Sequence, residues 1–436
     1  MPFATLAVAA MLAPIVVILG GIALGGDGLW NDFASYWLAG RLVLSGQSPY
    51  DVEAIVRLGR DYGIPFLAGT GYSYPLPFAV ASIPLSLLPF VAAGTIFTAV
   101  SLLAFGMAVA AWLRDGRLFD GRPRAAFAAA LLAGLYPPVS QSLFFGQANL
   151  LVLAAVATGV RLLVDGRRQA AGGMWIALGA VVKVAPLALL LPIVLARRWR
   201  AAAGLVLGGI ALLLAAAVVA PFGVVGEGSL AALAEPDPYW TNQSLNGLAS
   251  RLALGNERTV PLLAGVDPAV LSTAMLVAFG ALTLAVLLRA HRAQLTPGGF
   301  AVAVAFVLVA STAGAPKNSF WNHAPALISA GLLVSPVAGR ASWRAVDGWL
   351  VTAWLLLAGT QWWVDTLPWA FLRALGPASA VLTSAALLSL LVLWCAAGLR
   401  LLRLTPTPGP LPSGPMSPRT QASDTGSAPP RSRRTR

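Results

Sequence analysis

The chain has 436 residues, of which 58% are hydrophobic and only 10% are charged. A soluble protein carries roughly a quarter charged residues, so this composition excludes an ordinary soluble enzyme. One cysteine and two histidines exclude an internal disulfide framework, a cysteine zinc site and a histidine-rich metal site.

Long apolar segments dominate the chain, and a spanning helix needs about 20 mostly apolar residues. The segment 171–196 is too long for one span and carries Lys183 and Pro186 at its centre, which predicts two short helices that enter and return. We therefore expect an all-α polytopic membrane protein with about 12 transmembrane or re-entrant helices and two large extracytoplasmic loops. The other spans are predicted near 5–25, 91–113, 125–141, 148–164, 202–221, 266–288, 300–315, 324–338, 346–363 and 375–398. The first of these has no basic residue before it, which favours a retained helix over a cleaved signal peptide.

Arginine clusters between the predicted spans set the orientation, because cytoplasmic loops collect Arg and Lys. One topology places every cluster in the cytoplasm, with both termini inside and the tip of the 171–196 hairpin outside. The net charge of +13 is then a signal of topology and requires no nucleic-acid partner. The low lysine content, beside many Ala, Gly and Arg residues, indicates a bacterial plasma membrane. The clusters are Arg114, Arg117, Arg122 and Arg124; Arg161, Arg167 and Arg168; Arg197, Arg198 and Arg200; Arg289 and Arg292; Arg340 and Arg344; and Arg400 and Arg403.

The last part of the chain has a different composition. Residues 404–436 are rich in Pro, Ser, Thr, Gly and Arg and nearly lack large apolar side chains. Such a segment buries too little apolar surface to fold, so we expect a disordered cytoplasmic tail. Residues 1–403 form the membrane domain.

Asp32 lies a few residues beyond the first predicted span, in the first large outer loop. Asp32, Tyr36, Ala39 and Gly40 share one face of a short helix, because they lie at i, i+4, i+7 and i+8. Two interpretations remain open and do not exclude each other. Asn31 or Asp32 caps this helix, or Asp32 is a general base whose partial desolvation brings its pKa toward the working range.

The chain's two lysines, Lys183 and Lys317, both fall on the predicted outer half. A charge inside an apolar run such as that around Lys183 costs about 2.5–3.5 kcal/mol. This lysine either extends its ammonium to the lipid headgroups or contacts a phosphate. Lys317 lies in the polar and aromatic segment 315–323, which is also compatible with a solvated turn.

The second large outer loop is dense in amides and hydroxyls between residues 235 and 247. Asn242 and Gln243 suit hydrogen bonds to sugar hydroxyls. The rings of Tyr239 and Trp240 suit stacking on a sugar. Arg251 follows a few residues later.

Several short motifs follow one another along residues 30–325, and together they resemble a known family. They are DFASYW at 32–37 and GQSPYD at 46–51, YPLP at 74–77 and PLSLLP at 84–89, GQANL at 146–150, a segment 172–186 ending in KVAP, RRW at 197–199, and NQSL at 242–245. Their order and spacing resemble glycosyltransferase family 87, the polyprenol-phosphate-mannose-dependent mannosyltransferases of the GT-C superfamily. One departure is late in the chain. Where the family usually has a Ser-Pro and a Trp-His-His segment, this sequence has Ala315-Pro316 and Trp321-Asn322-His323.

The resemblance implies an inverting enzyme that transfers a sugar, mannose, from a polyprenyl-monophosphate donor to a glycolipid or polysaccharide acceptor on the outer face. It implies Asp32 as the general base. We expect no cofactor and no bound metal, because the sequence has no obvious metal-binding cluster, but acidic residues in the loops are also compatible with a cation. Basic residues stabilise the leaving phosphate, and our candidates are Lys183, Arg251 and Lys317. Our candidates for contacts to the sugar or acceptor are Tyr36, Tyr74, Gln147, Asn149, Tyr239, Trp240, Asn242, Gln243 and His323.

Two other functions are compatible with the composition. The first is a transporter or flippase of lipid-linked sugars, which places polar groups along a path through the bilayer. Apart from Lys183, the predicted bilayer midplane is almost uncharged, and this argues against a transporter. The second is a membrane scaffold without catalysis, which depends on no outer-loop residue.

Overall fold

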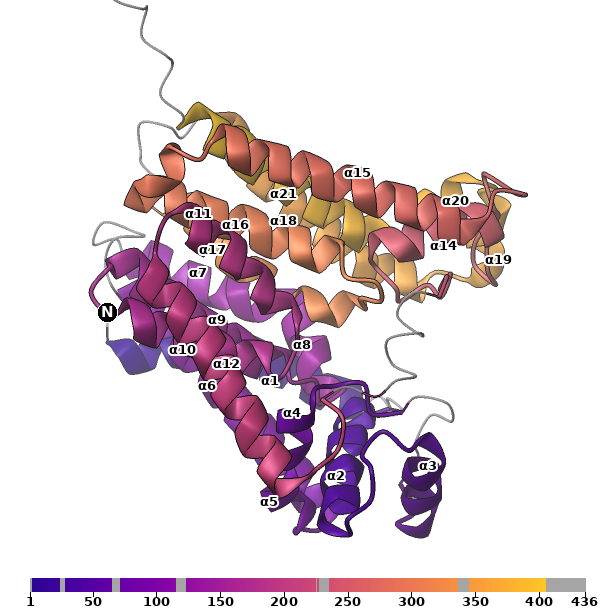
Figure 1. Cartoon of the computed structure of the whole chain (residues 1–436). Coiled ribbons are helices and arrows are strands. Elements are labelled where there is room, and N and C mark those ends of the chain that lie inside the picture. Colours follow the sequence, from indigo (N-terminus) through magenta and orange to yellow (C-terminus); the bar gives the residue numbers. More distant parts are fainter. Residues whose placement is uncertain are drawn as a thin grey trace, which may run out of the picture. The chain divides into compact units, whose positions relative to one another are not determined.

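In the computed structural model of the chain, the described residues are 2–23, 28–64, 71–114, 123–224, 226, 235–335 and 345–404. Their elements are all helices, apart from one isolated antiparallel bridge between Asn242 and Ser319 (Figure 1). The predicted all-α class is therefore confirmed. The chain divides into a unit of residues 1–405 and a unit of residues 406–436. The predicted disordered tail lies outside the described residues, apart from Leu404.

The described helices follow one another along the chain (Figure 1). Those before residue 224 are α1 (Phe3–Ala23), α2 (Asn31–Leu44), α3 (Val52–Asp61), α4 (Leu76–Ala81), α5 (Ile83–Ser86), α6 (Phe90–Arg114), α7 (Pro123–Leu135), α8 (Pro137–Phe144), α9 (Asn149–Asp165), α10 (Gln169–Ala180), η1 (Ala185–Leu189), α11 (Leu190–Leu195) and α12 (Trp199–Val219). Those after residue 235 are α14 (Leu245–Leu254), α15 (Pro268–Arg289), η2 (Ala293–Leu295), α16 (Pro297–Ala313), η3 (Phe320–His323), α17 (Ala326–Val334), α18 (Ala345–Thr366), α19 (Trp369–Ala374), α20 (Ala378–Leu382) and α21 (Ala385–Arg403).

Five helices of the described chain are long and apolar enough to cross a membrane, namely α1, α6, α12, α15 and α21. A sixth span results if α7 and α8, which meet at a bend of 48°, are counted as one. Large apolar side chains on α12 and α15 point out of the protein, for example Leu214, Val218 and Val277. Only a lipid environment solvates such helices without cost, so the chain is a polytopic membrane protein. The expected number of about 12 membrane segments stays a prediction.

The break predicted near Lys183 and Pro186 is present, whereas the return of the second helix through the membrane stays a prediction. α10 ends at Ala180, a break follows, and η1 and α11 come next in the chain. The break contains Lys183, and Pro186 follows within the first turn of η1. Proline fixes its own φ and lacks an N–H group, so it suits the first turn of a new helix and cannot continue the old one. Lys183 therefore lies between helices and outside the spanning segments.

Small residues let α10 and α12 pack closely (Figure 1). A Cβ atom added at Gly204 of α12 would lie 2.1 Å from the carbonyl oxygen of Ala170. Gly173 of α10 approaches the carbonyl of Ala201 equally closely. In lipid, helices associate through such backbone contact between small residues. This packing fixes the helix that leads to Lys183.

The described helices α2, α3, α4 and α5 form a cluster that carries Asp32 and packs against α6 and α12. The core of this cluster is aromatic: the rings of Phe33, Tyr36 and Trp37 are buried against those of Phe78 and Phe97 and their neighbours. Bulky buried rings restrict the rotation of α2 about its axis. They therefore fix the direction in which Asp32 points.

We expect Gly204→Ala to lower the thermal midpoint of the detergent-solubilised protein by at least about 2 °C, since overpacking costs about 1–3 kcal/mol. The added methyl group would meet backbone, which cannot move aside as a side chain does. Gly209→Ala on the same helix is the matched control, because nothing lies within 4 Å of a Cβ at that position. Equal midpoints for the two variants would contradict the close packing of α10 and α12.

Candidate functional site

Asp32 is the second residue of α2, and its carboxylate is not used to cap the helix. The N-cap is Trp30, at φ 61, and it makes no side-chain cap hydrogen bond. The backbone N–H groups of Trp30 and Asp32 instead donate to the carbonyl oxygens of Phe144 and Phe145, both at 2.9 Å. The capping interpretation of Asn31 and Asp32 is therefore wrong, and the carboxylate is left available for another partner.

The turn between α8 and α9 reaches that carboxylate because it contains a glycine. Gly146 has φ 68, and a Cβ atom there would lie 2.5 Å from the Cβ of Phe33. A left-handed backbone and this close approach both require glycine. The turn then presents Gln147, the next residue, to the start of α2.

Gln147 is the centre of a hydrogen-bond network that joins four predicted site residues. Its Nε2 donates to Oδ2 of Asp32 at 2.6 Å. Its Oε1 accepts from the hydroxyl of Tyr74 at 2.8 Å, from Nζ of Lys183 at 3.2 Å and from the hydroxyl of Tyr36 at 3.3 Å. Asp32 and Tyr36 meet the same amide, which agrees with the helix face expected from their spacing.

Lys183 connects this network to the segment 315–323. Its Nζ donates to Oδ1 of Asn322 at 2.6 Å. The same oxygen accepts from Nδ2 of Asn149, the first residue of α9, at 3.1 Å. Nδ2 of Asn149 also donates to the carbonyl oxygen of Trp321 at 2.9 Å. The structure thus brings together six of the predicted site residues: Asp32, Tyr36, Tyr74, Gln147, Asn149 and Lys183. We refer to these six residues and Asn322 as the Gln147 network.

Burial shifts the pKa of both charged groups in the network, Asp32 and Lys183. Desolvation raises the pKa of Asp32 above its ordinary value, while the Gln147 hydrogen bond and the positive charge of Lys183 oppose this rise. Desolvation lowers the pKa of Lys183 to about 7, and the negative charge of Asp32 opposes that shift. Gln147 lies between the two groups and contacts both. The carboxylate and the ammonium are therefore neighbours that are linked through one amide.

Arg251 lies outside the Gln147 network, and its guanidinium forms hydrogen bonds to other groups of the protein. It is fully buried and donates to the carbonyl oxygens of Tyr239 and Asn242, and to the hydroxyl of Ser384. Burial lowers its pKa to about 10. Arg251 thereby ties the loop before α14 to the start of α21.

The side-chain amides of Asn242 and Gln243, which were predicted to contact sugar, also form hydrogen bonds within the protein. Gln243 is fully buried and donates to the carbonyl oxygens of Trp240 and Thr383. The side chain of Asn242 accepts from the backbone N–H of Asn318 at 3.1 Å. These contacts hold two loops together.

His323 points away from the Gln147 network. Its ring is fully buried, and Nε2 lies 3.2 Å from the carbonyl oxygen of Gln243. Burial lowers the pKa of His323 to about 3. The ring is therefore neutral at physiological pH.

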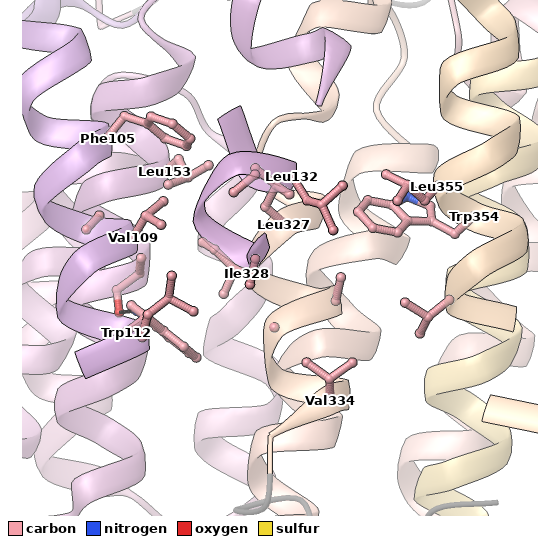
Figure 2. Close-up of a pocket in the computed structure, with 18 residues that line it drawn as sticks. Phe105, Val109, Trp112, Leu132, Leu153, Leu327, Ile328, Val334, Trp354 and Leu355 are labelled. Carbon is pink, nitrogen blue, oxygen red and sulfur yellow. Dashed lines mark hydrogen bonds between the residues drawn. The ribbon is translucent and has the colours of Figure 1, made fainter. Parts of the chain in front are cut away.

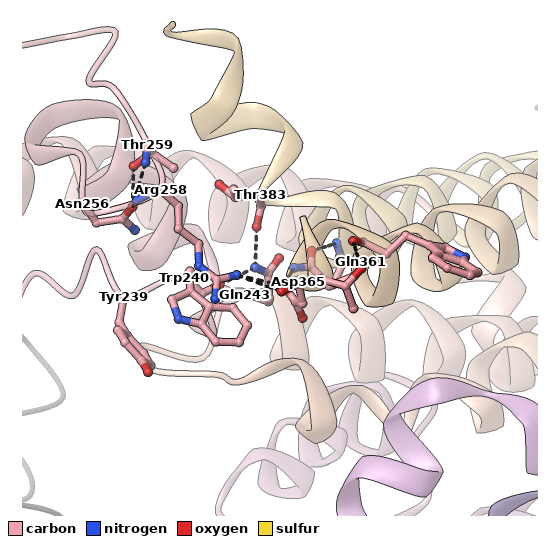
Figure 3. Close-up of polar contacts among 12 residues, drawn as sticks. Tyr239, Trp240, Gln243, Asn256, Arg258, Thr259, Gln361, Asp365 and Thr383 are labelled. Atoms are coloured by element: carbon pink, nitrogen blue, oxygen red, sulfur yellow. Dashed lines mark hydrogen bonds and ion pairs between the residues drawn. The ribbon is translucent and has the colours of Figure 1, made fainter. Parts of the chain in front are cut away.

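The remaining predicted residues lie at the surface or near it. Lys317 is exposed, and Tyr239 is 53% exposed. Trp240 is half-buried under the guanidinium of Arg258, which lies 3.8 Å from its ring centre (Figure 3). A carboxylate that the sequence did not single out, Asp365, lies 3.9 Å from the same guanidinium.

A large apolar cavity of about 240 Å³ lies among α6, α7, α9, α17 and α18 (Figure 2). Phe105, Trp112, Leu132 and Trp354 are among its lining residues, and none of the residues that line it carries a charge. It offers neither a base nor a cation. A carboxylate and an ammonium lie together in the Gln147 network instead. No group of three or more His, Cys, Asp or Glu side chains suited to a metal ion is found in the described ranges.

Sequence reasoning missed Asn322, although it lies in the segment that departs from the expected pattern. The aromatic and polar residues Trp321 and His323 indicated that the segment is a candidate for function. The sequence did not show which of the three side chains, Trp321, Asn322 or His323, contacts Lys183. That choice depends on the 3-10 turn of η3 and its packing on α8.

Comparison with known protein families gives one match. The model of glycosyltransferase family 87 matches residues 72–312, which is more than half of the chain. No curated protein and no solved structure matches. The matched region contains Tyr74, Gln147, Asn149 and Lys183, whereas Asp32 precedes it and Asn322 follows it.

We expect Arg251→Ala to destabilise the protein by at least about 2 kcal/mol, because the carbonyl and hydroxyl groups it satisfies are left buried without a donor. The measurement is thermal unfolding of the purified protein in detergent. Lys317→Ala removes a cation from an exposed position and should leave the midpoint unchanged. A similar, small effect of both variants would show that Arg251 does not hold the loop in place.

Proposed function

The chain belongs to glycosyltransferase family 87, and from this premise we propose that it transfers mannose from a polyprenyl-monophosphate donor to a glycolipid or polysaccharide acceptor. That the chain is a membrane glycosyltransferase follows from the family and from its apolar helices. The donor, the acceptor and the residue roles are our proposal. The observation that carries it is the single amide of Gln147, which contacts a carboxylate with one end and an ammonium with the other.

Asp32 is the general base of this proposal. The acceptor hydroxyl attacks the anomeric carbon of the donor sugar, and its proton passes to the Asp32 carboxylate. Desolvation raises the pKa of Asp32, which makes the carboxylate a better proton acceptor than one in water. Attack on the face opposite the leaving group inverts the anomeric centre, so a β-linked donor gives an α-linked product.

Lys183 is the group that stabilises the departing polyprenyl phosphate. The bond between the anomeric carbon and the phosphate oxygen breaks, and that oxygen gains negative charge. A compact ammonium suits a phosphate oxygen, and one held in a site with little water stabilises developing charge strongly. A monophosphate leaving group carries less charge than a diphosphate, so one lysine is a reasonable counterpart.

Gln147, Tyr36 and Tyr74 act as positioning residues in this scheme. The hydroxyl of Tyr36 donates to that of Tyr74 at 2.8 Å, and the hydroxyl of Tyr74 donates to Oε1 of Gln147 at 2.8 Å, so the two tyrosines fix the amide in one orientation. In that orientation the N–H of Gln147 meets the anion and the carbonyl meets the cation. On the other side, Oδ1 of Asn322 accepts from Lys183, and Asn149 donates to the same oxygen and holds it in place.

The distribution of arginines supports an extracytoplasmic site. α9 begins at Asn149 in the Gln147 network, whereas its far half carries Arg161. α12 follows Arg197 and Arg198, and α6 ends at Arg114. Arginines mark cytoplasmic loops, so we infer that the network lies on the outer side of a bacterial plasma membrane, with both termini inside.

Asp32→Asn should lower kcat about 100- to 10,000-fold, because an amide cannot accept the proton. The assay is transfer of labelled mannose from polyprenyl-phosphate-mannose in membranes that contain the variant. Asp61→Asn is the matched control, since Asp61 is an exposed carboxylate at the end of α3. Full activity of correctly inserted Asp32→Asn protein would remove Asp32 as the base.

The dependence of kcat/KM on pH should be bell-shaped. Activity should rise as pH passes the raised pKa of Asp32, because the base must be deprotonated. It should fall as pH passes about 7, where Lys183 loses the proton that gives it charge. Lys183→Arg should move this falling limb to higher pH, since the guanidinium stays protonated. An unchanged falling limb in Lys183→Arg would assign it to another group.

A further inference from the structure

A second cavity, of about 200 Å³, has the chemistry of a saccharide site. Its lining includes the rings of Phe145, Trp240 and Trp321 and the polar side chains of Gln141, Gln361 and Asp365. Aromatic faces suit the apolar C–H face of a sugar ring, and carboxylate and amide groups suit its hydroxyls.

The cavity adjoins the Gln147 network through two of its own lining residues. The carbonyl oxygen of Phe145 accepts the backbone N–H of Asp32 at 2.9 Å. The carbonyl oxygen of Trp321 accepts from Asn149, and the following residue, Asn322, contacts Lys183. Two of the residues that line the cavity therefore contact the Gln147 network through their backbone carbonyls, which makes the cavity a neighbour of the network.

Two buried polar atoms of the lining residues have no hydrogen-bond partner among the described residues. They are Oε1 of Gln141, which accepts hydrogen bonds, and Nε1 of Trp321, which donates them. Buried polar groups are almost always satisfied in native proteins, so each such atom needs a partner. A sugar hydroxyl both donates and accepts, and it suits this unpaired acceptor and donor.

Asp365 is held in a fixed position at the same cavity. Nε2 of Gln361 donates to its Oδ1 at 2.8 Å, and the guanidinium of Arg258 lies 3.9 Å away (Figure 3). The same guanidinium stacks on Trp240, so one arginine orients both a ring and a carboxylate of the lining. The guanidinium of Arg258 balances the charge of the Asp365 carboxylate, and the other lining residues are uncharged, which favours a neutral saccharide as the occupant.

We propose that this cavity binds the terminal sugar of the acceptor and presents one of its hydroxyls to Asp32. The proposal rests on the proposed transferase function and adds its acceptor subsite. Asp365 and Gln141 accept hydrogen bonds from sugar hydroxyls, and Trp321 donates one. Trp321, Gln361 and Asp365 all follow the family match, which ends at residue 312. The part of the chain beyond the match therefore contributes to the choice of acceptor.

The test uses octyl mannoside, octyl glucoside and octyl galactoside as membrane-soluble acceptors, with the protein in lipid nanodiscs. Asp365→Asn, Trp321→Phe and Gln141→Leu should each raise the KM for the preferred octyl glycoside about tenfold, as expected for one lost hydrogen bond. The KM for polyprenyl-phosphate-mannose should stay at its wild-type value. Trp363→Phe is the matched control, because this tryptophan of α18 is 71% exposed and does not line the cavity.

Equilibrium binding of a radiolabelled octyl glycoside separates this proposal from the transferase proposal, because it needs no turnover. Weaker binding by the three variants supports the subsite even where the donor proves to be another lipid. Gln141→Leu removes an oxygen that has no partner in the free protein, so its folding should be unaffected. Wild-type acceptor KM and binding in all three variants would overturn the subsite. A rise in the donor KM alone would assign the cavity to the donor sugar and overturn it as well.

Discussion

The site depends on keeping a carboxylate and an ammonium close together without direct contact. In a poorly solvated environment opposite charges attract strongly, and an ion pair between Asp32 and Lys183 would occupy the lone pairs that the proposed base needs. The Gln147 amide prevents this, because its N–H faces the anion and its carbonyl faces the cation. Each charge has a partner, and each keeps the capacity to meet a substrate.

The amide can do this only because the backbone around it is fixed from several directions. Gly146 brings the α8–α9 turn against Phe33, and the carbonyl oxygens of Phe144 and Phe145 satisfy the first N–H groups of α2. The break after α10 supplies Lys183, and the close packing of α10 on α12 holds that break in place. The network therefore combines residues inside the family match with Asp32 before it and Asn322 after it.

Local features of this structure were predictable from the sequence, and long-range ones were not. The spacing of Asp32 and Tyr36 placed them on one helix face, and Pro186 after Lys183 predicted the helical break, because both depend on neighbours within a few residues. The cap of α2 was predicted wrongly, since its partners come from residues more than a hundred positions away. For the same reason the sequence did not show that Arg251 and Gln243 bind loops of the protein itself, nor that Asp365 lies beside Arg258.

In the segment 315–323, the residue type at position 322 determines which groups of the site titrate. Asn322 accepts a hydrogen bond from Lys183 through an amide oxygen that keeps its charge state at every working pH. His323, next to it, is turned toward Gln243, and its low pKa keeps it neutral. A histidine at position 322 would add a group that can become positive beside an ammonium. With asparagine there, Asp32 and Lys183 remain the two charged groups of the Gln147 network, and each is charged in the form that its proposed role requires.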